Sequence, residues 1–285
     1  MTELAQATRR VLLPAGKTVA RRVMPHSMYR RYRQRKIASL VANYTPHSVT
    51  HTYAGHSLHI MLADPLAEGW YDRDWPQMGV TAFLRDRHVL VPGARVFDFG
   101  AHQAVVALIL AREVGERGHV LAIEAEPHNA RIGGENKALN SAENLTVMHA
   151  AGAATQGTIS FAEGLNGRID ERGSTGNIDV PAVTIDGLVD QHGTPDLVFI
   201  DVEGYEGQVL RGAGRTLANT STSFLVEVHE SLAAYGGNPQ QIADCFLGFD
   251  RYVAVGEGES FIALKGSLPE GRFFLVAISS RHQDR

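Results

Sequence analysis

Six acidic or imidazole side chains stand where the apolar strands predicted for this sequence come to an end. They are Asp98, Glu124, Asp201, Glu203, Glu227 and His229. A carboxylate at the end of a buried strand needs a partner or a ligand, because removing an unpaired charge from water is costly. Ligands of open parallel sheets bind beyond the carboxyl ends of the strands. The repeated acids therefore predict a binding site along one edge of a sheet.

Two pairs among these residues are two positions apart. Asp201 and Glu203 form one pair and Glu227 and His229 the other, so the members of each pair share a face if the backbone is extended. A positioned histidine or carboxylate can accept the proton of a hydroxyl group. We expect His229 or Asp201 to be the base, Glu203 to orient the acceptor and Glu227 to contact it. A hydrogen-bonded structural role for His229 is left open, as is a Mg²⁺ or Ca²⁺ ion held by the oxygens; no metal is favoured.

The stretch "RVFDFGAHQAVVALIL" at residues 95–110 joins a predicted strand to a predicted helix. A dinucleotide needs several glycines here, so that backbone N–H groups can approach the pyrophosphate, and this turn has only Gly100. Asp98 would also repel a phosphate. S-adenosylmethionine has no phosphate and carries an ammonium group for Asp98 and ribose hydroxyls for Glu124, which lies 26 positions later. These residues favour methyl transfer over hydride transfer. The alternative role for Asp98 is a hydrogen bond to a backbone amide, and the alternative for Glu124 is a solvated position at a helix start.

Apolar strands alternate with helices from residue 95 onward, which predicts a mostly parallel, doubly wound sheet covered on both faces. We expect strands at 95–100, 119–125, 144–151, 195–204 and 223–230, helices at 103–115, 127–140, 183–193, 205–220 and 238–249, and a terminal antiparallel hairpin at one edge. One or two short strands are predicted at 48–62, an aromatic acidic loop at 64–76 and a hairpin-like insertion at about 152–180.

Five blocks in this order resemble FkbM-type S-adenosylmethionine-dependent methyltransferases over roughly residues 80–235. The blocks are "VFDFGAHQA", "VLAIEAEPHN", "VTIDGLV", "PDLVFIDVEGYEGQVLRGA" and "FLVEVHE". The resemblance implies a Rossmann-like class I methyltransferase fold and O-methylation of a hydroxyl on a sugar, glycolipid, polyketide or other small molecule, with S-adenosylhomocysteine as product. The cofactor-binding residues that it implies are Asp98, Gly100, Ala101, His102, Glu124, Ala125, Ala151 and Asp201.

Two residues of the glycine turn depart from the family pattern. His102 stands where the family has Asn, and both residues tolerate the left-handed backbone conformation better than most. Ala104 replaces a glycine and adds a methyl group where cofactor and helix come close. These two changes motivate the alternative of a non-catalytic binding or scaffold protein on a methyltransferase fold.

The 285 residues are 44% hydrophobic and carry a net charge of −4 that is unevenly distributed. Residues 1–40 hold ten Lys or Arg against one Glu, a net +9, so the remainder carries −13. We expect a basic, partly helical N-terminal extension at 1–46 and a methyltransferase domain at 47–285, in which 47–92 shape the pocket. The extension could form a homo-oligomer or bind an anionic partner, but the acidic body argues against nucleic acid.

The remaining expectations concern surroundings and acceptor. The single Cys245 excludes an internal disulfide and a cysteine-based zinc cluster. No apolar run approaches the ~20 residues that span a bilayer, so we expect no membrane span and a cytoplasmic protein. Trp70 and Tyr71 are expected to line the pocket of a small-molecule or glycoconjugate acceptor, with plain packing as the alternative.

Overall fold

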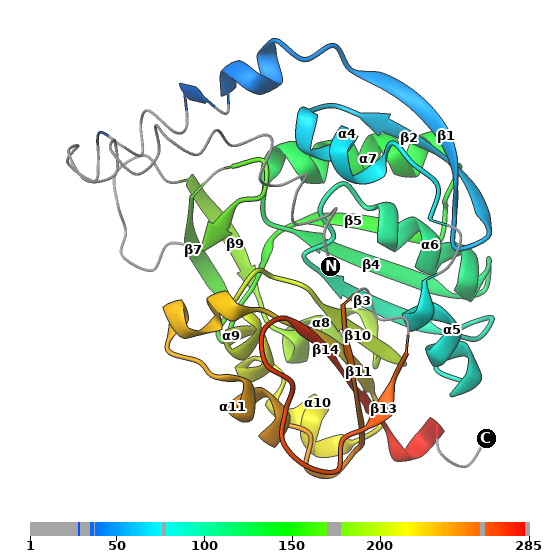
Figure 1. Ribbon diagram of the computed structural model, residues 1–285, viewed down its shortest axis with the longest axis vertical. Coiled ribbons are helices and arrows are strands. Elements are labelled where there is room, and N and C mark those ends of the chain that lie inside the picture. The colour runs from blue at the N-terminus through cyan, green and yellow to red at the C-terminus, as the bar shows by residue number, and fades with distance from the viewer. Residues whose placement is uncertain are drawn as a thin grey trace.

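An eight-stranded sheet forms the centre of the computed structural model, which describes residues 28, 35–36, 38–75, 78–162, 164–169, 178–256 and 260–282 (Figure 1). Its strand order is β13-β12-β14-β11-β10-β3-β4-β5. The strands are β3 (Arg95–Phe99), β4 (His119–Glu124), β5 (Leu145–His149), β10 (Leu197–Ile200), β11 (Ser223–Val228), β12 (Asp250–Val255), β13 (Ile262–Ala263) and β14 (Phe273–Ile278). This arrangement is the Rossmann-like class I methyltransferase fold, as the sequence predicted.

The five neighbouring strands β5, β4, β3, β10 and β11 are parallel, which places their carboxyl ends along one edge of the sheet. The predicted antiparallel terminal strand pair is confirmed, because β14 pairs antiparallel with β12 at this edge of the sheet. Strand β14 also pairs antiparallel with β11, so it is the inner strand of the pair. All six of its residues are buried, because "FFLVAI" is apolar on both faces.

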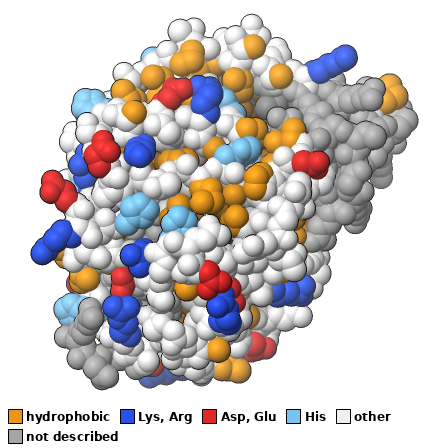
Figure 2. All heavy atoms as spheres, turned by 180° about the vertical axis from the view of Figure 1, so that it is seen from behind, with side chains coloured by type: hydrophobic (Ala, Val, Ile, Leu, Met, Phe, Trp, Pro, Cys, Tyr) orange, Lys and Arg blue, Asp and Glu red, His pale blue; other side chains and the backbone are white. Residues whose placement is uncertain are grey.

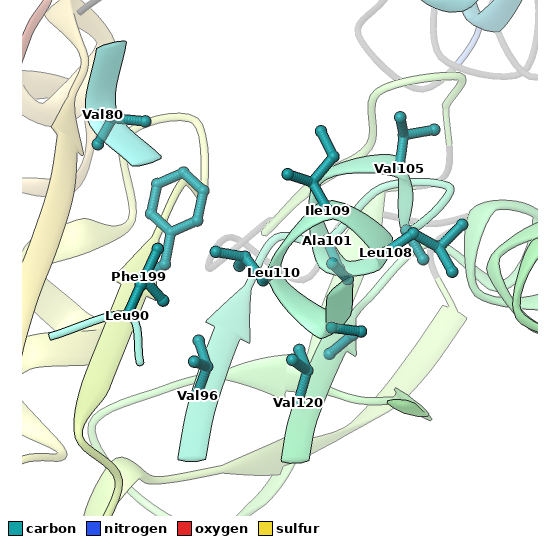
Figure 3. Close-up of a cluster of buried hydrophobic side chains, with 14 of the residues drawn as sticks. Val80, Leu90, Val96, Ala101, Val105, Leu108, Ile109, Leu110, Val120 and Phe199 are labelled. Atoms are coloured by element: carbon teal, nitrogen blue, oxygen red, sulfur yellow. The ribbon is translucent and has the colours of Figure 1, made fainter. Parts of the chain in front are cut away.

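Two hydrophobic clusters cover the two faces of this sheet. On one face α6 (Val105–Val114) and α5 (Gly79–Asp86) pack with the hairpin of β1 (His47–Tyr53) and β2 (His56–Leu62). Figure 3 shows Leu108 and Ile109 of α6 above Val96 and Val120 of the sheet, all of them fully buried. Burying one such leucine or isoleucine contributes about 1.5–3 kcal/mol to folding.

The other face carries α8 (Ile185–His192), α9 (Glu206–Arg211) and α11 (Pro239–Asp244), with α10 (Gly214–Asn219) beside α8. Helix α7 (Pro127–Leu139) contacts β5 and β2. Two short 3₁₀ helices, η1 (Glu230–Tyr235) and η2 (Ser280–His282), follow β11 and β14. None of the described helices is both long and apolar enough to cross a membrane.

A second sheet, β6-β9-β7-β8, comes from the predicted insertion and lies beside the main sheet (Figure 1). Its strands are β6 (Ala151–Gly152), β7 (Gly157–Ala162), β8 (Arg168–Ile169) and β9 (Ile178–Val183). The pairing of β7 with β9 is antiparallel, as a hairpin requires. Residues 163 and 170–177 of the insertion lie outside the described residues, as does most of the predicted extension at 1–46.

Two local predictions were wrong. The aromatic loop begins with a helix, α4 (Pro65–Tyr71), because the Asp64 carboxylate accepts hydrogen bonds from the N–H groups of Leu66 and Ala67 and Pro65 suits a first helical position. The single helix predicted at 205–220 is two helices, α9 and α10. Gly212 lies between them and Gly214 begins α10, and glycine disfavours a continuous helix.

Candidate cofactor and acceptor site

A cavity opens at the carboxyl ends of the parallel strands, which is where open parallel sheets bind their ligands. Six of the eight predicted cofactor-binding residues line it, namely Gly100, His102, Glu124, Ala125, Ala151 and Asp201. Asp98 and Ala101 do not. Other lining residues, Phe161, Asn166 and Ile169 among them, come from the insertion at 152–180, which was expected to shape the pocket although these residues were not singled out.

The glycine turn between β3 and α6 holds three residues with positive φ, which are Gly100 at +89°, His102 at 49° and Ala104 at 62°. The Gly100 N–H donates to the Ile123 carbonyl at 2.9 Å and ties the turn to β4. A Cβ atom on Gly100 would lie 1.7 Å from the Asp201 carbonyl oxygen. Only glycine therefore lets the turn pass this close to the end of β10.

His102 lines the cavity and uses both of its ring nitrogens. Nδ1 lies 2.8 Å from the Tyr71 hydroxyl and Nε2 lies 3.2 Å from the Leu165 carbonyl. Burial lowers the pKa of His102 to about 4, so the ring is neutral at physiological pH. A neutral ring donates from Nε2 to Leu165 and accepts from Tyr71 at Nδ1. His102 thus joins the glycine turn, α4 and the loop that borders the cavity.

Glu124 ends β4 at the cavity wall. Its Oε2 accepts the N–H of His102 at 2.7 Å and its Oε1 accepts the N–H of Glu126 at 2.7 Å. Burial raises the pKa of Glu124 to about 8, against the effect of these two hydrogen bonds. Each carboxylate oxygen has further lone-pair capacity, so Glu124 can also accept hydrogen bonds from the two hydroxyls of a ribose.

Asp98 lies below the cavity and is 1% exposed. Its Oδ2 atom has no hydrogen-bond partner among the described residues. Burial, and then the nearby Asp201 charge, raise the pKa of Asp98 to about 8. An unpartnered buried carboxylate is costly to ionise, and a ligand ammonium group would remove that cost.

The four polar residues that follow β10 and end β11 come together in one cluster, which we call the acid–histidine cluster (Asp201, Glu203, Glu227 and His229). The Nε2 atom of His229 lies 3.5 Å from Asp201, 3.7 Å from Glu227 and 3.8 Å from Glu203. Asp201 and Glu203 line the cavity, whereas Glu227 and His229 stand beside them without lining it. The cluster therefore faces the cavity through Asp201 and Glu203.

A buried glutamate that the sequence analysis missed supports this cluster. Glu206, at the start of α9, is fully buried, and its Oε1 lies 2.6 Å from His229 Nδ1. The same oxygen accepts the Gly204 N–H at 2.9 Å. Glu206 is the last acid of the block "IDVEGYE". It was not predicted as a site residue because it follows the end of the strand by several residues. The contact leaves Nε2 of His229 directed at the three other acids.

Shared protons and one arginine balance the charge of the cluster. Asp201 and Glu227 are hydrogen-bonded to each other; burial, and then the Glu227 charge, raise the pKa of Asp201 well above its usual value. Burial also raises the pKa of Glu227, although the half-exposed Arg272 guanidinium forms an ion pair with it. The pKa of His229 is raised because the hydrogen bond to Glu206 and the neighbouring acids outweigh its burial.

Comparison with protein families finds that residues 98–250, more than half of the chain, match the methyltransferase FkbM domain. The chain belongs to this family. This FkbM-family protein is an S-adenosylmethionine-dependent methyltransferase, and the match covers both the glycine turn and the acid–histidine cluster.

Solved structures of other methyltransferases are similar at low identity. Precorrin-6y C5,15-methyltransferase from Geobacter metallireducens GS-15 has 17% identity and a TM-score of 0.44, over 72% of this chain and 90% of that one. Methyltransferase FkbM from Methylobacillus flagellatus KT has 14% identity and a TM-score of 0.42, over 65% of this chain and 43% of that one. Comparison with curated sequences gave no significant match.

The acceptor residues predicted for this FkbM-family protein, Trp70 and Tyr71, lie behind the cavity wall. Tyr71 is buried and bonded to His102, and the ring of Trp70 lies 4.9 Å from the ring of His102. Neither residue lines the cavity. Their observed contacts position His102, and a direct contact with an acceptor stays a prediction.

Ala104, the other departure from the family pattern, does not line the cavity. A Cβ built on Gly133 of α7 would lie 3.1 Å from the Ala104 methyl group, so this methyl faces α7. Ala104→Gly should therefore leave the affinity for S-adenosylmethionine within about twofold. It relieves about 1–2 kcal/mol of left-handed strain but loses a buried methyl worth about 0.8 kcal/mol and adds chain entropy. Titration calorimetry measures the affinity, and thermal unfolding measures the net effect on stability. A tenfold change in affinity would show that the methyl group does shape the cofactor site.

Proposed function

We propose that this FkbM-family methyltransferase transfers the methyl group of S-adenosylmethionine to a hydroxyl of a sugar, glycolipid, polyketide-type metabolite or other small molecule. The observation that carries the proposal is the position of the acid–histidine cluster. Two of its members, Asp201 and Glu203, line the same cavity as the proposed ribose acceptor Glu124. In this proposal the cofactor and the proton-accepting groups share one cavity.

The roles proposed for the cofactor residues follow from their contacts. Asp98 has an unpartnered oxygen for the ammonium group, and Glu124 has lone pairs for the ribose. The small side chains of Ala125 and Ala151 leave room along the cavity wall for the flat adenine ring. Gly100, and the backbone of Ala101 and His102, border the methionine part of the cofactor.

The reaction itself is an in-line displacement. The acceptor oxygen approaches the methyl carbon to ~3–3.5 Å, the C–O bond forms as the C–S bond breaks, and S-adenosylhomocysteine leaves. The hydroxyl proton must pass to a base, and Asp201, Glu203 and His229 are the residues proposed to manage it. The proton can pass directly to His229 or Asp201, or a bound cation can first acidify the hydroxyl. Both routes require the acceptor oxygen to lie at the acid–histidine cluster, so the proposed reaction is the same in either case.

Two other functions are less well supported. A nucleic-acid methyltransferase would be expected to present a basic patch, but charges of both signs are scattered over the described residues of the face in Figure 2. A non-catalytic scaffold protein was motivated by His102 and Ala104. The first supports the turn through three contacts, and the methyl of the second faces α7.

Binding and turnover test the proposal separately. Thermal unfolding of the full chain should show stabilisation by both S-adenosylmethionine and S-adenosylhomocysteine. Mass spectrometry of hydroxyl-bearing acceptors should then show the gain of one methyl group. Absence of stabilisation by either compound would contradict the enzyme function. A chain without residues 1–40 provides a further comparison, because unchanged activity would exclude the basic extension from catalysis.

A further inference from the structure

We propose that Asp201, Glu227 and His229 form a binding site for a divalent cation, with Mn²⁺ or Mg²⁺ as the occupant. The sequence did not favour a metal because the direction of the histidine ring could not be read from it. In the structure, each of the three residues offers a ligand atom, and these atoms all lie within 4.8 Å of one another.

The separations suit ligands around one ion. His229 Nε2 lies 3.5 Å from Asp201 Oδ1 and 3.7 Å from Glu227 Oε1. Neighbouring ligands of an octahedral ion with bonds of roughly 2.1 Å are about 3 Å apart, so small side-chain movements would complete the site. The observed separations are also too long for good hydrogen bonds. Nε2 of His229 thus points at these two acids without a good hydrogen bond to either.

The ring of His229 is held as a metal-binding histidine is held. Its Nδ1 is bonded to the fully buried Glu206, a partner that fixes the tautomer and directs the Nε2 lone pair outward. The His229 side chain is only 8% exposed, and its Nε2 lies 3.5 Å or more from each of the surrounding acids. A buried, oriented and weakly bonded nitrogen is therefore aimed at the centre of the acids.

The chemistry of the donors narrows the choice of ion. Two carboxylates and one imidazole suit Mn²⁺ and, through the oxygens, Mg²⁺, whereas the absence of thiolates disfavours ions that prefer sulfur. Arg272 pairs with Glu227 from the protein surface and is 54% exposed. It can turn into solvent when an ion takes its place. Glu203, which is 45% exposed, remains outside this ligand set.

A cation here would act on the acceptor, and this role rests on the proposed function. Binding of the acceptor hydroxyl oxygen to the ion lowers the pKa of that hydroxyl. The O–H bond then breaks, the proton passes to the Glu203 carboxylate, and the oxygen attacks the methyl carbon as the C–S bond breaks. His229 serves as a ligand in this arrangement rather than as the base.

Calorimetric titration of the chelator-stripped full chain with Mn²⁺ tests the site without reference to turnover. We expect one ion per chain, competition by Mg²⁺, and loss of binding in Asp201→Asn and Glu227→Gln. Glu206→Gln should weaken Mn²⁺ binding by about 10–100-fold, because it only supports a ligand. Glu113→Gln is the matched control: Glu113 is a buried acid that also pairs with a histidine, His56, at 3.0 Å, and its variant should bind Mn²⁺ as the wild type does.

Thermal unfolding of each variant establishes that it is folded before it is titrated. Failure of the folded wild type to bind Mn²⁺ at millimolar concentration would overturn the site, as would equal binding by the Asp201 and Glu227 variants. Stabilisation of the stripped protein by S-adenosylmethionine is measured alongside. Its presence leaves the proposed function standing when the metal site fails, and its absence contradicts the proposed function itself.

Discussion

Gly100→Ala is expected to lower the free energy of unfolding by more than about 4 kcal/mol and to abolish cofactor binding. The new Cβ would lie 1.7 Å from the carbonyl oxygen of Asp201 and 2.7 Å from its carbonyl carbon. Both atoms belong to the backbone at the end of β10, so no side-chain rotation relieves the clash. Either the glycine turn or the residues after β10 must move, and both border the cavity.

Gly55→Ala is the matched control for this variant. Gly55 has φ +87°, close to the +89° of Gly100, but a Cβ there would meet no atom within 4 Å. The control therefore carries the left-handed strain alone, about 1–2 kcal/mol, and should bind S-adenosylmethionine normally. Denaturant unfolding and calorimetry on both variants separate strain from clash. Equal destabilisation of the two variants would show that the backbone at Asp201 moves at little cost and that its closeness does not require glycine at position 100.

The sequence predicted the parallel part of the sheet because each strand there is an apolar run followed by a polar residue. It did not predict the place of β14, since an apolar strand fits equally well at an edge or between two neighbours, and only the pairing with β11 and β12 decides between them. The helix α4 was missed for a local reason. The capping role of Asp64 becomes apparent only once its carboxylate is seen to bind the N–H groups of the first turn.

Some residues of the candidate site could likewise be predicted from the sequence, and others could not. Residues at strand ends, such as Glu124 and Asp201, could be predicted because the parallel topology itself brings them together. Glu206 belongs to a helix, and its bond to His229 depends on how α9 packs against β11. Phe161 and Ile169 reach the cavity from the second sheet, whose position no local pattern encodes. Sequence spacing therefore could not predict the contacts that α9 and the second sheet make with the site.

Binding of S-adenosylmethionine to the metal-free protein is expected to strengthen as the pH rises from 6 to 7, by up to about tenfold. The pKa of Asp98 is raised to about 8 by burial and by Asp201, so in the empty site this carboxyl is protonated throughout that range. An ammonium ligand favours the ionised form, and its binding therefore releases a proton. Because proton release becomes easier with rising pH, the dissociation constant must fall. The increase should level near pH 8, where Asp98 ionises unaided and the α-amino group of the ligand, with a pKa of about 7.7–8.0, loses its own proton.

Two neutral variants decide which carboxylate carries this pH dependence. Asp98→Asn removes the titrating group and should give a flat profile, with affinity at pH 8 reduced by about 10–100-fold for the lost charged hydrogen bond. Glu124 is the matched control, because burial also raises its pKa to about 8, yet its proposed partners are uncharged ribose hydroxyls. Glu124→Gln should therefore bind more weakly but keep the slope. Calorimetry with a chelator in several buffers measures the affinity and the released proton together. A flat wild-type profile, or a slope lost in Glu124→Gln and kept in Asp98→Asn, would exclude Asp98 as the ammonium partner and assign the cationic end of the cofactor to another part of the cavity.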